Sequence, residues 1–154
     1  MNRMRQALQV RRLYTSILPI ALVLVLISSA CSNEMSRVPS EVQEVVAHIG
    51  ELMAQERYDQ IYSESSERWK QDVTLEQSNE VFKTLRAKLG KVDSRSLHTA
   101  TEQQNSGGVL KGHVFILSYQ TRFERGEGME TFTLIEENGQ WRLARYLANS
   151  TALQ

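Results

Sequence analysis

The spacing of apolar residues changes at Gly90, and this change constrains the fold more than any other feature of the chain. Before Gly90, apolar side chains recur three and four residues apart, which is the period of helices that pack on a core. After Gly90, apolar and polar residues alternate, which is the period of strands with one buried face. Helices followed by a run of strands predict an α+β fold.

Three helices are predicted before the change of period. The first opens with the capping-box sequence Ser40–Gln43 and carries an apolar stripe to about residue 53. The second covers about 58–70. The third opens with another capping box, Thr74–Gln77, and ends at Gly90, because a helix that ends in a left-handed cap favours glycine there.

Four strands are predicted after the change of period. They cover 92–101, 109–123, 130–136 and 141–147. The turns between them contain glycine, and Asn138–Gly139 is the strongest hairpin signal in the chain. Short turns connect antiparallel strands, so we expect three helices packed on a curved, four-stranded antiparallel sheet, a cone or roll over residues 40–150.

The first thirty residues have the pattern of a secretory signal peptide. Residues 1–16 hold four arginines and no acid, and residues 17–27 form an apolar run with one proline. As a helix this run rises only about 16 Å, whereas the hydrocarbon core of a membrane is about 30 Å thick. We therefore expect residues 1–30 to be a cleaved signal.

The only cysteine of the chain, Cys31, follows this signal directly. Ile27–Cys31 resembles the bacterial lipobox, with one departure, because Ser28 stands where Leu, Val or Ile is usual. The resemblance implies that Cys31 is acylated, with palmitate among the chains, and becomes the mature N-terminus. The alternative is a conventional cut near Ala30 that leaves a free thiol. We expect residues 31–39, which lack periodicity and end in a proline, to be a short tether.

These features predict a protein of the bacterial cell envelope whose N-terminal lipid is embedded in a membrane. In the enterobacterial sorting rule, an aspartate after the cysteine retains a lipoprotein at the inner membrane. Ser32 stands at that position, which favours the outer membrane, with the domain facing the periplasm. Membrane lipid is therefore the first expected partner.

Composition excludes several other partners and chemistries. The chain has 18 basic and 18 acidic residues, but four of the basic ones precede residue 31, so the remainder carries a net charge of −4. Such a charge argues against a nucleic-acid binder. One cysteine and three scattered histidines argue against a metal site, and no nucleotide- or cofactor-binding motif is present.

Several segments together resemble a family of small exported bacterial proteins that is known only as a domain of unknown function. They are Tyr58, Trp69, Arg86, Leu89–Val92, Ser94–Arg95, Leu97, Tyr119–Phe123, Glu130–Leu134, Gly139–Leu143 and Tyr146. The likeness spans about 42–149. It implies a cone-shaped fold similar to nuclear transport factor 2 and to cystatin-like rolls, and it supplies no catalytic residues.

Two charged residues are the main candidates for a site. Arg95 and Glu130 lie in predicted strands, and either could turn inward; we expect them to form a partly buried ion pair, although either could instead face a ligand. The aromatic residues that could line a pocket are Tyr58, Tyr62, Trp69 and Tyr119. For most large aromatic side chains of this chain, including Trp141, a place in the core is the expected role.

The favoured function is a non-catalytic envelope lipoprotein that binds a small molecule or another envelope protein. The alternative is a small enzyme of isomerase or hydrolase type that uses a carboxylate in the cone, for which Asp59 and Glu130 are the candidates. No catalytic residue is assigned, because the sequence offers no nucleophile–base pair.

Overall fold

The structure is a computed structural model, and it describes residues 38–154. The expected signal at 1–30, the expected lipidation site Cys31 and all but the last two residues of the expected tether lie outside the described residues. No helix within the described part is long and apolar enough to cross a membrane.

Within residues 38–154, four helices precede four strands. The helices are α2 (Ser40–Ala54), α3 (Tyr58–Glu64), α4 (Glu67–Asp72) and α5 (Leu75–Leu89). The strands are β1 (Val92–Asn105), β2 (Gly112–Phe123), β3 (Gly126–Glu137) and β4 (Gln140–Ser150), and a short 3-10 helix, η3 (Thr151–Leu153), ends the chain.

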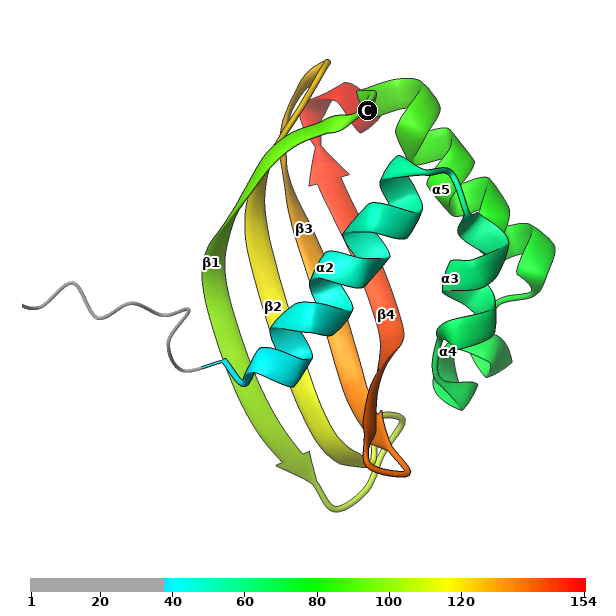
Figure 1. Cartoon of the computed structure of the whole chain (residues 1–154), viewed down its shortest axis with the longest axis vertical. Helices are drawn as coiled ribbons and strands as arrows, with labels where there is room; N and C mark the ends of the chain where they lie inside the picture. Colours follow the sequence, from blue (N-terminus) through cyan, green and yellow to red (C-terminus); the bar gives the residue numbers. More distant parts are fainter. Residues whose placement is uncertain (1–37) are drawn as a thin grey trace, which may run out of the picture. The chain divides into compact units, whose positions relative to one another are not determined.

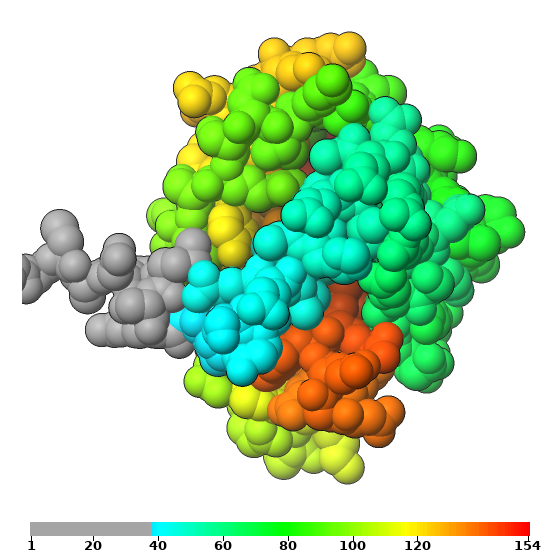
Figure 2. Space-filling model, in the orientation of Figure 1, coloured from blue at the N-terminus to red at the C-terminus, as the bar shows by residue number. Residues whose placement is uncertain are grey.

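The sheet has the order β1-β2-β3-β4, and every neighbouring pair is antiparallel. The sheet is curved, and the helices lie on one of its faces, with α2 crossing in front of the strands (Figure 1). These features confirm the predicted α+β fold class. In the space-filling view, α2 covers the middle of this face and the surface is hollowed beside it (Figure 2).

The predicted second helix is divided into α3 and α4 at two buried serines. The backbone of Ser65 and Ser66 is extended, and the Ser66 amide donates a hydrogen bond to the Leu143 carbonyl of β4 at 2.9 Å. The Ser66 hydroxyl then accepts from the Trp69 amide, which caps α4. A helix cannot continue through residue 66, because its amide is bonded to the sheet.

The two predicted capping boxes have different outcomes. The box at Thr74 and Gln77 is present in full. The box at Ser40 is absent, because the helix begins one residue earlier than expected: Pro39 is the N-cap, and Ser40 is already helical. The side-chain amide of Gln43 donates instead to the Val38 carbonyl, at 2.7 Å.

Strands β1, β3 and β4 extend beyond their predicted ends, whereas β2 begins at Gly112, three residues later than predicted. The added residues are mostly polar and exposed, as in the second half of β1, so they give no burial signal in the sequence. The hairpin signal is confirmed: Asn138 and Gly139 both have positive φ angles, of 54° and 75°, as a tight turn between β3 and β4 requires.

The main core lies between the helices and the sheet. Phe82 of α5 lies at its centre, with ring centroids 5.8 Å from Tyr58 and 5.4 Å from Tyr146. Among the described residues, the buried members of this core run from Val38 to Tyr146. They all lie within the compact unit Glu34–Gln154.

Candidate functional site

The structure contains the ion pair predicted between Arg95 and Glu130. Two parallel hydrogen bonds join them: Nε to Oε2 at 2.5 Å and Nη2 to Oε1 at 2.9 Å. The Glu130 side chain has no exposed surface, and that of Arg95 is 18% exposed. The pair is not formed between neighbouring strands, because Arg95 of β1 reaches across β2 to the carboxylate on β3.

Two hydroxyl groups complete this arrangement. The Thr121 hydroxyl donates to Oε2 of Glu130 at 2.7 Å, and the Tyr146 hydroxyl donates to Oε1 at 2.6 Å. Each of the four strands thus contributes one member of a polar belt, defined as Arg95, Thr121, Glu130 and Tyr146. Each carboxylate oxygen accepts two hydrogen bonds, which uses the acceptor capacity of the group.

Burial, and after it the neighbouring Glu130 carboxylate, raises the pKa of the Tyr146 hydroxyl well above its usual value of 10. This hydroxyl therefore keeps its proton and remains a donor to the carboxylate. A carboxylate with four donors at fixed positions is well placed to hold the strands together. It has no acceptor position left for a ligand or a reacting proton.

Helix α2 packs closely on the belt at Gly50. A Cβ atom at this position would lie 2.8 Å from Nη1 of Arg95, so only glycine leaves room for the guanidinium. The guanidinium carbon also lies 5.7 Å from the ring centroid of Phe132. The glycine in the apolar stripe of this helix therefore marks its crossing over a buried charge.

The four aromatic residues proposed for a pocket lie in different places. Tyr58 is buried and lines a cavity beside α5. Tyr62 is partly buried against the core. Trp69 is buried, and its indole nitrogen donates to the Ser78 hydroxyl at 3.2 Å. Tyr119 is buried against Phe132, and burial raises its pKa.

Asp59, a candidate base for the enzymatic alternative, lies on the outside of α3. Its side chain accepts a hydrogen bond of 2.5 Å from the amide of Asn79, and this contact is exposed. Asp59 is therefore placed to join α3 to α5. It does not face the concave side of the sheet, where a base in the cone would have to act.

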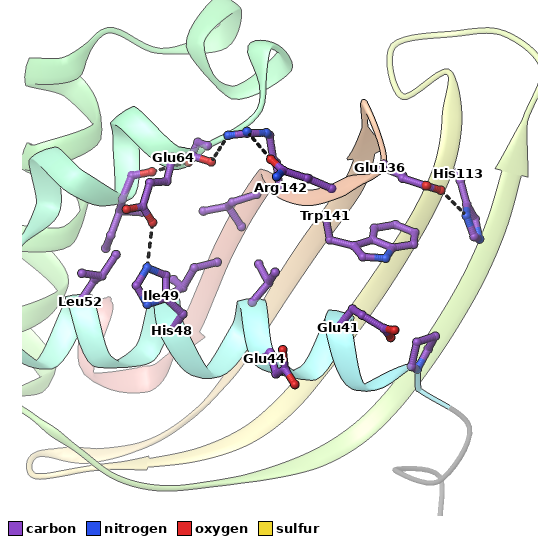
Figure 3. A pocket seen from close by; sticks show the side chains of 17 residues that line it. Glu41, Glu44, His48, Ile49, Leu52, Glu64, His113, Glu136, Trp141 and Arg142 are labelled. Carbon is purple, nitrogen blue, oxygen red and sulfur yellow. Dashed lines mark hydrogen bonds and ion pairs between the residues drawn. The ribbon is translucent and has the colours of Figure 1, made fainter.

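An open groove of about 860 Å³ runs between α2 and the β3–β4 hairpin. We call it the α2–β4 groove; Glu41, Glu44 and His48 line its helical side, and Trp141 and Arg142 its strand side (Figure 3). The groove was not expected from the sequence, because its two sides come from segments about one hundred residues apart.

One end of the groove is formed around Trp141, which is partly buried rather than enclosed in the core. Its ring meets the His113 ring edge-on at a centroid distance of 4.8 Å. His113 is held between two carboxylates, with Nε2 at 2.6 Å from Glu102 and Nδ1 at 2.9 Å from Glu136. These hydrogen bonds, from Glu102 first, raise the pKa of His113.

The other end of the groove holds a histidine–carboxylate pair, in which Nε2 of His48 lies 2.8 Å from Oε2 of Glu64 (Figure 3). Burial alone would raise the pKa of Glu64, but hydrogen bonds from Gln60 and His48 outweigh it and lower the pKa. Arg142 donates to the Glu64 backbone carbonyl at 3.1 Å. Among residues 38–154, no group of three His, Cys, Asp or Glu side chains is arranged to hold a metal ion.

The observations define a class of protein: a small α+β domain in which helices cover one face of an antiparallel sheet that is braced by a polar belt. Residues 46–146 match the family described as "Protein of unknown function (DUF4019)", and the chain belongs to this family. The match covers all four members of the belt and the strand side of the groove. No curated protein matches the chain.

Proposed function

We propose that the protein is a non-catalytic lipoprotein of the bacterial envelope, anchored through Cys31, which docks a basic segment of another envelope protein in the α2–β4 groove. The signal-like N-terminus and the lone cysteine support the anchoring, and Ser32 favours the outer membrane. We further propose that the fold belongs with the cone-shaped domains that resemble nuclear transport factor 2.

The observation that carries the docking proposal is the charge of the groove. Four carboxylates line it: Glu41, Glu44, Glu64 and Glu136. Glu64 and Glu136 contact histidines, whereas Glu41 and Glu44 form no ion pair within residues 38–154. Among the described residues, Arg142 is the only arginine or lysine of the lining.

Trp141 and Glu41 line the same groove, so a cation bound there would meet an aromatic ring as well as carboxylates (Figure 3). The groove is open along the surface, which suits an extended polypeptide better than an enclosed small molecule. The saturated Glu130 carboxylate supports a structural role for the belt and not a catalytic one.

Peptide probes test the docking. Purified Glu34–Gln154 is titrated with an octalysine peptide and, separately, with an octaglutamate peptide, while NMR follows the two indole signals. We expect octalysine to move the Trp141 signal in a saturable way and to leave that of the buried Trp69 in place. Equal binding of octaglutamate would contradict the proposal.

Charge reversal locates the site on α2. Glu44→Lys should weaken octalysine binding by about tenfold, because it replaces an attraction by a repulsion in the groove. Glu51→Lys is the matched control, since Glu51 is exposed on the same helix but does not line the groove. An equal loss in both variants would show that net charge, and not the groove, determines binding.

The anchoring is tested in cells. Labelled palmitate should be incorporated into the wild-type protein and not into Cys31→Ala, and the wild-type protein should fractionate with the outer membrane. Ser32→Asp should shift it to the inner membrane. Label that persists in Cys31→Ala would refute lipidation at this residue.

A further inference from the structure

A second, more enclosed space of about 340 Å³ lies at the other end of α2, where the helix faces the start of β1 and the side of α5. We call it the Arg95 cavity. Its walls are largely apolar and include Met53, Phe82, Leu85 and Phe123. In Figure 2 the surface is hollowed at this place between α2 and β1, and atoms of β4 are visible at the bottom.

The charges that line this cavity all have the same sign. Arg86, Lys91 and Arg95 line it, and no acidic residue of the part that the structure describes does so. Arg86 contacts the exposed Glu56 at 3.4 Å, whereas Lys91 forms no ion pair within residues 38–154. The cavity therefore combines apolar walls with a cationic rim, which is the pattern that an anion with an apolar body would match.

Arg95 has one nitrogen to spare for such an anion. Glu130 uses Nε and Nη2, while Nη1 lies against Gly50 and forms no hydrogen bond within the described residues. The carboxylate behind it fixes the orientation of the guanidinium, so binding would cost little side-chain entropy. Because Glu130 already balances the charge of Arg95, the site suits a monoanion better than a multiply charged group.

We propose that the Arg95 cavity binds a small amphiphilic carboxylate, such as a single-chain fatty-acid anion. The carboxylate contacts Nη1 of Arg95 and the Lys91 ammonium, and the apolar body lies between Met53 and Leu85. A volume of 340 Å³ is near the lower end of the range for ligand pockets, about 300–1,000 Å³, which fits one chain or one ring system and not a two-chain lipid.

Three ligands with the same chain test the role of charge. Glu34–Gln154 is titrated with decanoate, 1-decanol and decyltrimethylammonium, and binding is followed by calorimetry and by NMR of the cavity residues. We expect saturable binding of decanoate and binding of decanol that is at least about tenfold weaker, a difference of about 1.4 kcal/mol. Decanol that binds as tightly as decanoate, or a cation that competes with it, would overturn the proposal.

Two pairs of variants locate the site. Lys91→Gln should weaken decanoate binding about three- to tenfold and leave decanol binding unchanged. Lys111→Gln removes the same charge from the loop at the far end of β1 and should have no effect. Leu85→Trp should fill the cavity and abolish binding, whereas Val81→Trp places the same ring at an exposed site on α5.

Binding that survives Leu85→Trp would overturn the proposal, as would equal losses in the two lysine variants. Decanoate binding to the Arg95 cavity does not depend on the α2–β4 groove. Glu44→Lys should leave decanoate binding intact, so failure of the docking proposal and failure of this one give different results.

Discussion

At the scale of single residues, the buried charge pair is the most sensitive point of the molecule. Arg95→Ala and Glu130→Ala should each lower the free energy of unfolding by about 3–5 kcal/mol, because each leaves the other charge buried without its partner. The loss in the double variant should be smaller than the sum of the two. Urea unfolding of all three variants measures these values.

A surface ion pair provides the control. Arg68 and Asp72 form a pair on α4 with side chains that are 27% and 38% exposed. Arg68→Ala should change the free energy of unfolding by no more than about 0.5 kcal/mol, as is usual for exposed pairs four residues apart on a helix. Strictly additive losses at Arg95 and Glu130, or losses as small as this control, would show that the buried pair is not coupled.

Gly50 gives a second test of the same site. Alanine in the middle of a helix is usually favoured over glycine by about 1 kcal/mol, but at Gly50 its Cβ would lie 2.8 Å from Nη1 of Arg95. Gly50→Ala should therefore fail to stabilise the wild-type protein, and should stabilise the Arg95→Ala variant by about 1 kcal/mol. Equal effects in both backgrounds would mean that α2 moves to accommodate the methyl group.

The two charged residues of the belt could be predicted from the sequence, and the two hydroxyls could not. Arg95 and Glu130 lie in strand segments where either could face inward, and an inward charge needs a partner of opposite sign. Thr121 and Tyr146 carry no charge, so nothing in the alternating pattern required them to contact a carboxylate. Their places follow from the register of the four strands.

At the scale of secondary-structure elements, the N-terminal caps of α5 and α2 can be compared by two matched substitutions. Thr74→Ala should lower the free energy of unfolding by about 1 kcal/mol, because the hydroxyl accepts from the Gln77 amide at the start of α5. Ser40→Ala should cost much less, because Ser40 is inside α2 and caps nothing. Thermal unfolding of both variants compares them, and equal losses would show that the Ser40 hydroxyl, and not only Pro39, caps α2.

The division between α3 and α4 shows why local patterns were insufficient. The apolar spacing from Tyr58 to Trp69 is compatible with one helix, and a serine pair alone does not end one. The break depends on Ser66, whose amide and hydroxyl both donate to the Leu143 carbonyl, 77 residues further along the chain. A contact of such long range leaves no signal in the neighbouring sequence.

The α2–β4 groove, like the break between α3 and α4, depends on contacts between segments that are distant in the sequence. His48 and Glu64 are exposed polar residues on two successive helices, and each is unremarkable in its own segment. They form a site only because the β3–β4 hairpin brings Trp141 and Arg142 to the same place (Figure 3). The fold class followed from periodicity within segments, whereas this site depends on how distant segments pack.

At the scale of the whole domain, the position of α2 organises the concave face of the sheet. The helix packs on the polar belt at Gly50 and leaves an opening towards each of its ends. The opening at the N-terminal side is lined by four carboxylates, and the one at the C-terminal side by three cations. Ligands of opposite charge would therefore be directed to opposite ends of one helix.

The stability of the domain should also depend on pH through His113, which links three strands. Glu102 on β1 and Glu136 on β3 hold the imidazole from both sides and raise its pKa above the usual value of about 6.5. The folded state then binds this proton more tightly than the unfolded state. The resulting stabilisation is complete below about pH 6.5 and is lost as the pH rises through the raised pKa of the folded protein.

His113→Gln should therefore destabilise the domain more at about pH 5.5 than at about pH 9, since only the charged imidazole gains from the two carboxylates. Urea midpoints of the wild-type protein and the variant at both pH values measure the difference. The control repeats the His113→Gln substitution in a protein that already carries Glu102→Gln and Glu136→Gln. There the loss of stability should no longer depend on pH, because the carboxylates that raise the pKa of His113 are absent. Any loss that comes from packing of His113 against Trp141 should remain. A loss that is the same at both pH values in the wild-type background would show that His113 contributes only through its contact with Trp141.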